Sequence, residues 1–283
     1  MDVRRYYRCV PFTLSHPAAA IPFARSRLVL SALVIGSMAP DFQYFLHLTG
    51  QERNAHTYPG VVLLTFPAAI VCLFLFHAVL KWPAISLLPR PLQERLVEPA
   101  RRFRWSPADR TMLVLASLAV GILTHIAWDS FTHVDGLIVS SWPSLRVPLF
   151  YVGRTGIPPF KVAQHLSTLA GGLFVLFCFA RWYAAARRLP SAVPRLLPAD
   201  LTVALVGIGI ALTVTVGIIS GLRASGGAGD LPALQRFASG FAVTSVSTAA
   251  LLLLAYSTAW WCLVGRAGRE RSSKEHLTGV SSQ

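Results

Sequence analysis

Three metal-capable side chains recur at a regular spacing in one stretch of the sequence. They are His125, Asp129 and His133, at positions i, i+4 and i+8 of the run HIAWDSFTH. On a helix this spacing places all three on one face. Imidazole and carboxylate groups suit zinc and other transition ions. An ion with one open coordination position would lower the pKa of its bound water towards about 7 and supply a hydroxide nucleophile. The stretch therefore predicts a metal site capable of hydrolysis.

Further histidines and an aspartate fall where they could complete such a site. We predict metal ligation by seven residues: His16, Asp41, His56, His125, Asp129, His133 and His165. Asp129 lies one helical turn from His125 and one from His133, so it could bridge two ions. Asp41 and His133 are the candidate catalytic residues, with His133 or His165 assisting proton transfer. The predicted cofactor is a divalent metal ion, zinc in the first place and manganese in the second.

The elements that would hold these residues are membrane-spanning helices. Only 13% of the residues are charged, whereas soluble domains carry about 25%. A transmembrane helix needs about 20 apolar residues. Five runs meet this requirement, and they cover residues 60–80, 111–131, 164–183, 199–222 and 237–264. We therefore predict an all-α, polytopic membrane protein. Because ionisable groups at membrane depth are costly, His125 and Asp129 inside a span indicate function.

The N-terminal region is compatible with two structures. Residues 12–24 are too short to span a membrane, and residues 28–47 could form a sixth span. His16 would then lie at the opposite end from Asp41, because a helix of 20 residues is about 30 Å long. Alternatively, residues 12–24 and 28–40 form a short helical hairpin that turns at residues 25–27 and returns His16 and Asp41 to the same end. The charge pattern favours the single span. The chemistry favours the hairpin, which the helix bundle would have to shelter.

The balance of charge indicates partners and orientation. The chain has a net charge of +14, but its short polar loops offer no soluble face to nucleic acid, so we expect membrane lipids as partners and no nucleic acid. Lys and Arg concentrate in cytoplasmic loops. Fifteen of them lie in residues 81–110, 181–195 and 266–274, and six lie in the alternate loops. We predict a multi-pass cell-membrane protein with a cytoplasmic C-terminus and the His/Asp site at the outer face.

The chain divides into three predicted parts. A membrane core with the metal site covers residues 1–183, two C-terminal transmembrane helices cover 184–264, and a disordered tail covers 265–283. Within the core, the long loop at 134–163 is either a lid over a site or a passive connector. Four widely spaced cysteines, without a Cys-x-x-Cys pair, indicate neither a disulfide framework nor a thiolate metal site.

Four short motifs point to a known family. They are PFTLSHPAA from Pro11, GSMAPDF from Gly36, HxxWDSFTH from His125, and the pair Gln164-His165. Together they resemble an uncharacterised bacterial membrane family, the "domain of unknown function 4184" family. The likeness extends from about Pro11 to Gly172. It implies a multi-pass protein of the bacterial inner membrane and does not imply a reaction.

The order of the candidate ligands is also similar to that of bacterial membrane-bound metal-dependent hydrolases, zinc-dependent phospholipase C and fungal zinc nucleases. Their pattern runs His, Asp, His, His-x3-Asp, His and then His-x3-Glu. The resemblance would assign one ion to Asp41, His56, His125 and Asp129. A second ion would use His16 and Asp129. This sequence departs from the pattern at its end, because Leu169 stands four residues after His165. The resemblance therefore implies one or two ions rather than three.

These observations favour a membrane-bound metal-dependent hydrolase. Its substrate would be a small molecule or a lipid, with a phosphoester as the bond to be cleaved. The alternative is a non-enzymatic membrane protein: an ion or proton transporter that uses the His/Asp cluster, or a scaffold. A transporter needs a polar path to both faces of the membrane. The half of the span from Thr111 to Gly121 contains no ionisable residue, so we rank the hydrolase first.

Overall fold

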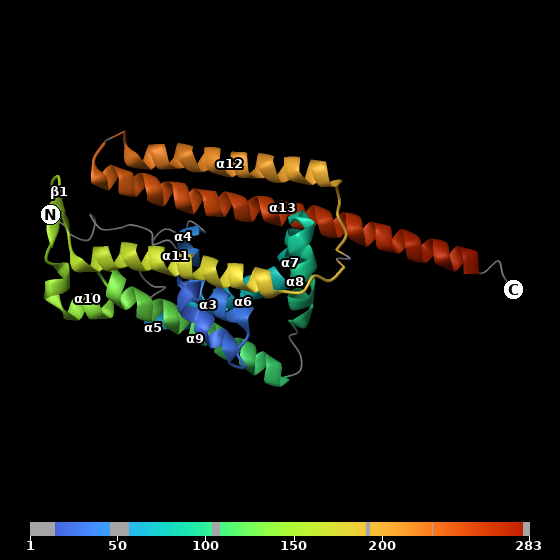
Figure 1. Ribbon diagram of the computed structural model, residues 1–283, viewed down its shortest axis with the longest axis horizontal. Coiled ribbons are helices and arrows are strands. Elements are labelled where there is room, and N and C mark those ends of the chain that lie inside the picture. The colour runs from blue at the N-terminus through green and yellow to red at the C-terminus, as the bar shows by residue number, and fades with distance from the viewer. Residues whose placement is uncertain (1–14, 46–56, 104–107, 191–192, 228, 280–283) are drawn as a thin grey trace. The chain divides into compact units, whose positions relative to one another are not determined.

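A computed structural model describes residues 15–45, 57–103, 108–190, 193–227 and 229–279, and Figure 1 shows its elements. The N-terminal elements are α2 (Pro17–Ala20), η2 (Ile21–Arg25), α3 (Leu30–Met38), η3 (Ala39–Asp41) and α4 (Phe42–Phe45). Next come α5 (Tyr58–Gly60), η4 (Val61–Thr65), α6 (Phe66–Leu75), η5 (Phe76–Leu80), α7 (Lys81–Leu87) and α8 (Arg90–Arg102). The remaining elements are α9 (Ala108–Thr132), α10 (Leu137–Ser141), η6 (Pro143–Arg146), β1 (Phe150–Val152), β2 (Thr155–Ile157), α11 (Pro159–Ala185), α12 (Ala199–Ser225) and α13 (Leu231–Gly279).

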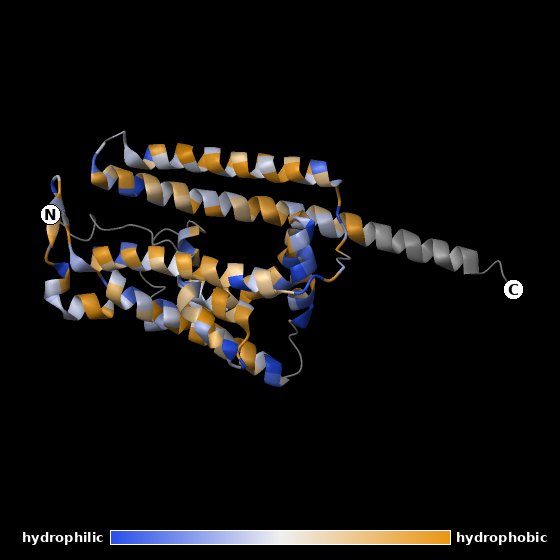
Figure 2. Cartoon of the chain, viewed as in Figure 1, coloured by the Kyte–Doolittle hydropathy of each residue, from blue (hydrophilic) through white to orange (hydrophobic). Residues whose placement is uncertain are grey.

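Five helical stretches in the described ranges are long and apolar enough to cross a membrane. They are Tyr58–Leu87, Asp109–Ser141, Pro159–Ala185, Ala199–Ser225 and Leu231–Val264. Each contains one of the five apolar runs read from the sequence, so the all-α polytopic prediction is confirmed. Figure 2 shows much orange along α11 and α12, whereas α8 is mainly blue. Their exposed apolar side chains suit contact with lipid, where only helices and closed barrels satisfy every backbone group.

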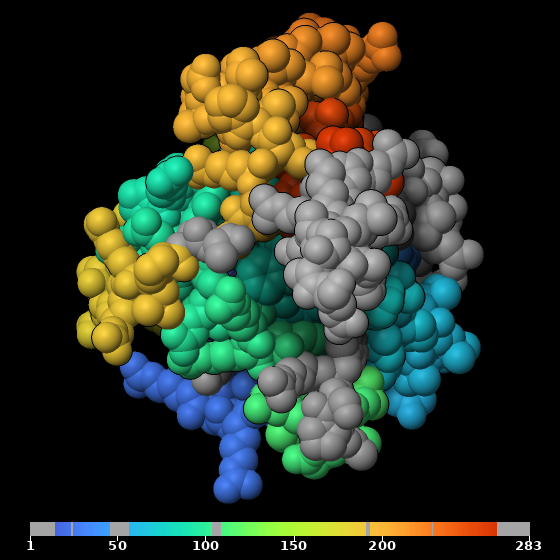
Figure 3. All heavy atoms as spheres, turned by 90° about the vertical axis from the view of Figure 1, so that its right-hand side faces the viewer, coloured from blue at the N-terminus to red at the C-terminus, as the bar shows by residue number. Residues whose placement is uncertain are grey.

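The N-terminal region forms the short helical hairpin rather than a sixth span. α2 and η2 make the first arm, and α3 with η3 makes the second. Ser26 stabilises the turn, because its hydroxyl donates to the Phe23 carbonyl at 2.6 Å and accepts from the Leu28 amide at 3.2 Å. Figure 3 shows this turn, in blue, at the surface. The single-span alternative, which the charge pattern favoured, is wrong.

The second arm of the hairpin lies against α9, and close backbone contact holds the pair together. The buried positions of α9 recur every three or four residues, at 114, 117, 118, 121, 122, 125, 129 and 132. Gly36 and Gly121 lie where the helices meet. A Cβ on Gly36 would collide with the Leu118 carbonyl oxygen, and one on Gly121 with the Leu33 carbonyl oxygen. Small residues allow such an approach between helices in membranes. The hairpin thereby presents its two ends to the face of α9 that bears His125 and Asp129.

A structured loop connects α9 to α11. Gly136 turns the chain back against the last turn of α9, where a Cβ would collide with the Asp129 carbonyl oxygen. α10 and η6 follow, and then β1 pairs antiparallel with β2, with Tyr151 opposite Gly156. Gly153, at the tip of this ribbon, has φ +60°, a conformation that favours glycine. The loop is therefore an ordered connection rather than an open chain.

The chain forms two compact units. The first contains residues 1–73, 104–185 and 213–247, and the second contains 74–103, 186–212 and 248–283. In the second unit the Leu189 amide donates to the Glu94 carbonyl at 3.0 Å, and the Trp261 indole donates to the Val79 carbonyl at 2.9 Å. α13 continues as a helix to Gly279, past the end of the predicted last span at Val264. The proposed division at 183 and 264 stays a prediction.

Candidate metal centre

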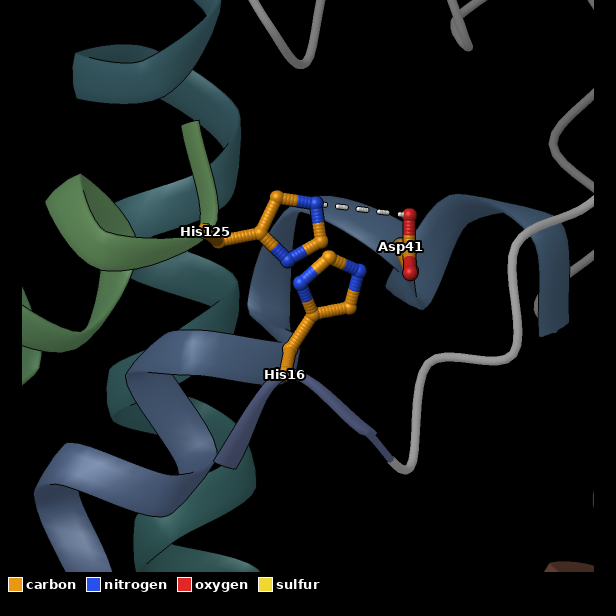
Figure 4. A group of neighbouring side chains, drawn as sticks. All are labelled: His16, Asp41 and His125. Carbon is orange, nitrogen blue, oxygen red and sulfur yellow. Dashed lines mark ion pairs between the residues drawn. The ribbon is translucent and has the colours of Figure 1, made fainter. Parts of the chain in front are cut away.

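Three elements of the first unit bring a buried group of two histidines and an aspartate together. His16 lies at the start of the hairpin, Asp41 at its end and His125 on α9. Figure 4 shows the three side chains converging from these elements. One ligand atom from each lies within 4.8 Å of the other two. The exposed fractions are 2%, 0% and 0%. Residues 109 positions apart in the sequence thus form one cluster, which depends on the hairpin.

His125 is oriented by the backbone of the hairpin. Its Nδ1 lies 2.7 Å from the Ser37 carbonyl oxygen. Because a carbonyl only accepts, Nδ1 carries a hydrogen and donates it, and Nε2 is the atom available to a ligand. Nε2 lies 3.1 Å from Asp129 Oδ2 and 3.7 Å from Asp41 Oδ1. A backbone carbonyl that fixes the ring of a histidine in this way is common behind metal ligands.

Asp129 connects three imidazole rings. Its Oδ1 lies 3.2 Å from His133 Nδ1 and 3.7 Å from His16 Nε2, while Oδ2 faces His125 Nε2. The spacing of four residues places His125 and Asp129 on one face of α9, and His133, directly after its last residue, lies on the same side, as the sequence predicted. His16 stacks on His125 with ring centroids 3.9 Å apart, and its ring meets Trp128 edge-on. The aspartate is therefore the residue through which the cluster is joined.

A second line of hydrogen bonds reaches the cluster from α11. The Lys161 ammonium donates to Gln164 Oε1 at 2.7 Å, and the Gln164 amide nitrogen lies 3.2 Å from His133 Nε2. Both α11 side chains are buried, with 2% and 4% exposed. His133 is the most accessible member of the cluster, with 27% of its side chain exposed. Gln164 therefore orients His133, so that Nδ1 faces Asp129.

The structure distributes the seven predicted ligands unevenly. It brings five of them together: His16, Asp41, His125, Asp129 and His133. His56 lies outside the described residues. His165 has an exposed side chain, while its neighbour Gln164 is buried and reaches His133. Gln164 and Lys161 were not predicted as parts of the site. Their spacing of three residues, in an apolar helix start, is the signal that could have identified them.

The ligand atoms lie at separations that suit a metal ion. Ligands about 2.0–2.2 Å from a tetrahedral zinc ion lie about 3.4 Å apart. The distances from His125 Nε2 to the two carboxylates are 3.1 and 3.7 Å, and His16 Nε2 lies 3.7 Å from Asp129. The donors are imidazole nitrogens and carboxylate oxygens, which bind zinc and manganese. The residues present therefore fit a divalent cation.

The charges of the cluster also favour a cation. Asp41 and Asp129 are withdrawn from water, and a buried charge is costly unless it is compensated. Because His125 donates to Ser37 through Nδ1, a neutral ring would direct the lone pair of Nε2 towards both carboxylates. That contact is repulsive. A proton on Nε2 or a metal ion among these atoms removes the repulsion.

Comparison with known proteins assigns the chain to a family. A model of the family described as "Domain of unknown function (DUF4184)" matches residues 10–258. No curated protein and no solved structure matches the chain. The resemblance to metal-dependent hydrolases therefore stays a prediction. The matched region contains every residue of the buried cluster and all but the end of the last span, and so this polytopic helical protein belongs to the domain of unknown function 4184 family.

Proposed function

We propose that the His/Asp cluster binds a divalent metal ion and that the protein is a membrane-bound metal-dependent hydrolase. The observation that carries the proposal is the position of His125 Nε2 between two buried carboxylates, 3.1 and 3.7 Å away. A bound ion would supply an activated water at neutral pH. The bond that we propose to be cleaved is a phosphoester, carried by a lipid or another intermediate of the cell envelope.

The roles of the residues follow from their positions. His16, Asp41, His125 and Asp129 would hold the ion. Ser37 and Gln164 would orient the rings of His125 and His133, since each makes a hydrogen bond to one ring nitrogen. His133 is the most exposed group of the cluster, and it would accept or return a proton during hydrolysis. The distribution of Lys and Arg supports a site at the outer face and a cytoplasmic C-terminus.

The first experiment measures metal content and hydrolysis on the same preparation. We expect the protein purified in detergent to contain about one equivalent or more of zinc or manganese, in keeping with the sites that this donor set forms. We also expect it to hydrolyse a chromogenic phosphodiester in a reaction that a chelator stops and added metal restores. A folded protein that neither contains nor takes up either ion would refute the metal site.

A second function, proton transfer, is favoured by one observation. The hydrogen bonds from Lys161 through Gln164 and His133 to Asp129 form a continuous polar line. The face of α9 that continues away from the cluster, however, buries Val114, Leu118 and Ile122. The buried hydroxyl on this face, that of Ser117, is hydrogen-bonded to backbone groups. A transporter needs ionisable or hydrated groups along its path. Proteoliposomes containing a pH-sensitive dye would decide, because a proton path dissipates an imposed gradient and a hydrolase does not.

The two neighbouring residues on α11 allow a direct test of the site's composition. We expect Gln164→Leu to weaken metal binding about 10-fold, because Gln164 holds His133, and His133 in turn is the partner that orients the metal-binding Asp129. His165→Leu makes the same chemical change at an exposed position and should leave the affinity unaltered. Isothermal titration calorimetry with zinc measures the affinity of both variants. A loss of affinity in His165→Leu alone would reverse the assignment.

A further inference from the structure

The loop between α9 and α11 carries an exposed apolar surface. Six large side chains of this loop are between 48% and 69% exposed: Trp142, Val147, Leu149, Phe150, Tyr151 and Val152. We call these residues the apolar loop surface. Single exposed apolar side chains are normal on a surface that faces water, but several large ones within one short loop mark a site of interaction. The function proposed above makes no use of these side chains.

The backbone holds this surface in place. The two strands pair from Phe150 opposite Ile157 to Val152 opposite Thr155, and the Leu149 amide donates to the Ile157 carbonyl at 2.9 Å. The Arg146 guanidinium donates to the Val134 carbonyl at 2.8 Å, which attaches η6 to the end of α9. Thr155, on the second strand, is buried. These backbone hydrogen bonds order the loop, and the apolar side chains are therefore held in exposed positions.

The position of the surface in the chain identifies what it contacts. It lies between two helices that are able to cross the membrane, Asp109–Ser141 and Pro159–Ala185. Phe131, near the end of α9, and Leu166, near the start of α11, are 55% and 62% exposed, as is expected of apolar side chains on a membrane span. Exposed apolar side chains are therefore found on the two spans and also on the loop beyond their ends. Trp and Tyr are the residues enriched where a membrane meets water.

We propose that the apolar loop surface is inserted into the bilayer leaflet on the side of the candidate metal centre, and that its partner is lipid. Phe150 and Val152 extend from one strand of a two-stranded ribbon, and such a ribbon needs support from other contacts because it is only marginally stable alone. Lipid supplies that contact. The proposal concerns this surface alone and stands whether or not the cluster binds a metal.

Fluorescence quenching in nanodiscs tests the insertion. The four native cysteines are replaced, and an environment-sensitive label is attached to Phe150→Cys. The water-facing control is Gly229→Cys, in the exposed loop between α12 and α13, where a new Cβ meets nothing within 4 Å. Two spans separate the two loops, so both lie on the same side of the bilayer. The lipid-facing control is Ile208→Cys on α12, where the native side chain is 67% exposed.

We expect nitroxide-bearing lipids to quench the label at position 150 several-fold more than the label at 229, and to a degree approaching that at 208. Aqueous iodide should show the opposite order. Equal quenching at 150 and 229 by both agents would mean that the surface faces water and would overturn the proposal. Protection of position 150 from both agents would overturn it as well, because a second copy or a partner protein would then cover the surface.

Discussion

Replacement of Asp129 by Asn is expected to abolish metal binding at the cluster. Asp129 is the residue that connects His16, His125 and His133, through contacts of 3.7, 3.1 and 3.2 Å. Asn retains the size of the side chain and loses its negative charge, and an amide is a poor ligand for zinc. Loss of a residue that only orients a ligand weakens metal binding by about 10- to 100-fold. Loss of the ligand itself should weaken metal binding further. Metal analysis after gel filtration measures the loss.

Thermal unfolding separates loss of the ligand from loss of the fold. A ligand at about 100 times its dissociation constant stabilises the native state by about 2.7 kcal/mol. Added zinc should therefore raise the melting temperature of the wild-type protein and leave that of Asp129→Asn unaltered. The matched control is Asp135→Asn, an exposed aspartate six residues further along. It should respond to zinc as the wild type does. Stoichiometric, tightly bound metal in Asp129→Asn would contradict the assignment.

The membrane spans and one face of the site could be predicted from local features of the sequence, namely the length of apolar runs and the spacing of residues along a helix. Runs of apolar residues are long enough to be recognised individually, so all five spans were identified from the chain alone. The placement of His125, Asp129 and His133 on one face follows from 3.6 residues per turn. Both inferences use only local spacing, which is why they needed no knowledge of how helices pack.

The N-terminal hairpin could not be decided in the same way, because contacts between distant residues determine it. The Val29 amide, at the start of α3, donates to the Ser117 hydroxyl at 2.8 Å, across 88 residues of sequence. Charge counting considers each loop separately and so favoured a single span. The requirement that His16 and Asp41 share one end indicated the hairpin correctly. A predicted site that requires distant residues to lie close together can therefore decide between two topologies that the hydropathy pattern leaves open.

The contribution of α11 to the site depended on helical phase. His165 was the natural candidate because imidazole binds metal, but one residue along a helix corresponds to about 100° of rotation, from 3.6 residues per turn. With α11 starting at Pro159, Gln164 and Lys161 occupy the buried face, and His165 has an exposed side chain. Sequence shows which residue types are present near a site. The start of the helix and its packing determine which of them point into it.

The close approach of α3 to α9 leads to the second large expected effect, that of Gly121→Ala. A methyl group at Gly121 would collide with the Leu33 carbonyl oxygen and would lie 2.8 Å from the Ser37 amide nitrogen and 3.0 Å from the Gly36 carbonyl carbon. All three are backbone atoms, which cannot rotate away as a side chain can. The hairpin must therefore move from α9. We expect a loss of about 2–3 kcal/mol in the free energy of unfolding, the upper part of the range for overpacking.

The same movement should disturb the metal centre, although Gly121 has no side chain that could bind an ion. Ser37 is the residue whose carbonyl orients His125 at 2.7 Å, and its amide is among the atoms that the methyl group would displace. Asp41 follows four residues later on the same arm. Gly121→Ala should therefore weaken zinc binding as well as stability, and the two losses should appear together in denaturant unfolding and metal titration.

Gly172→Ala provides the matched control, because it makes the same change within another membrane helix. A Cβ at Gly172 meets nothing within 4 Å. Alanine is favoured over glycine inside a helix by about 0.5–1 kcal/mol, so this variant should be as stable as the wild type or slightly more so. Because the substitution is the same at both positions, changes of opposite sign in the free energy of unfolding must come from the surroundings of each position. Equal stability of Gly121→Ala and the wild type would show that the hairpin does not pack on α9 at this distance, and the cluster that depends on that packing would have to be rejected with it.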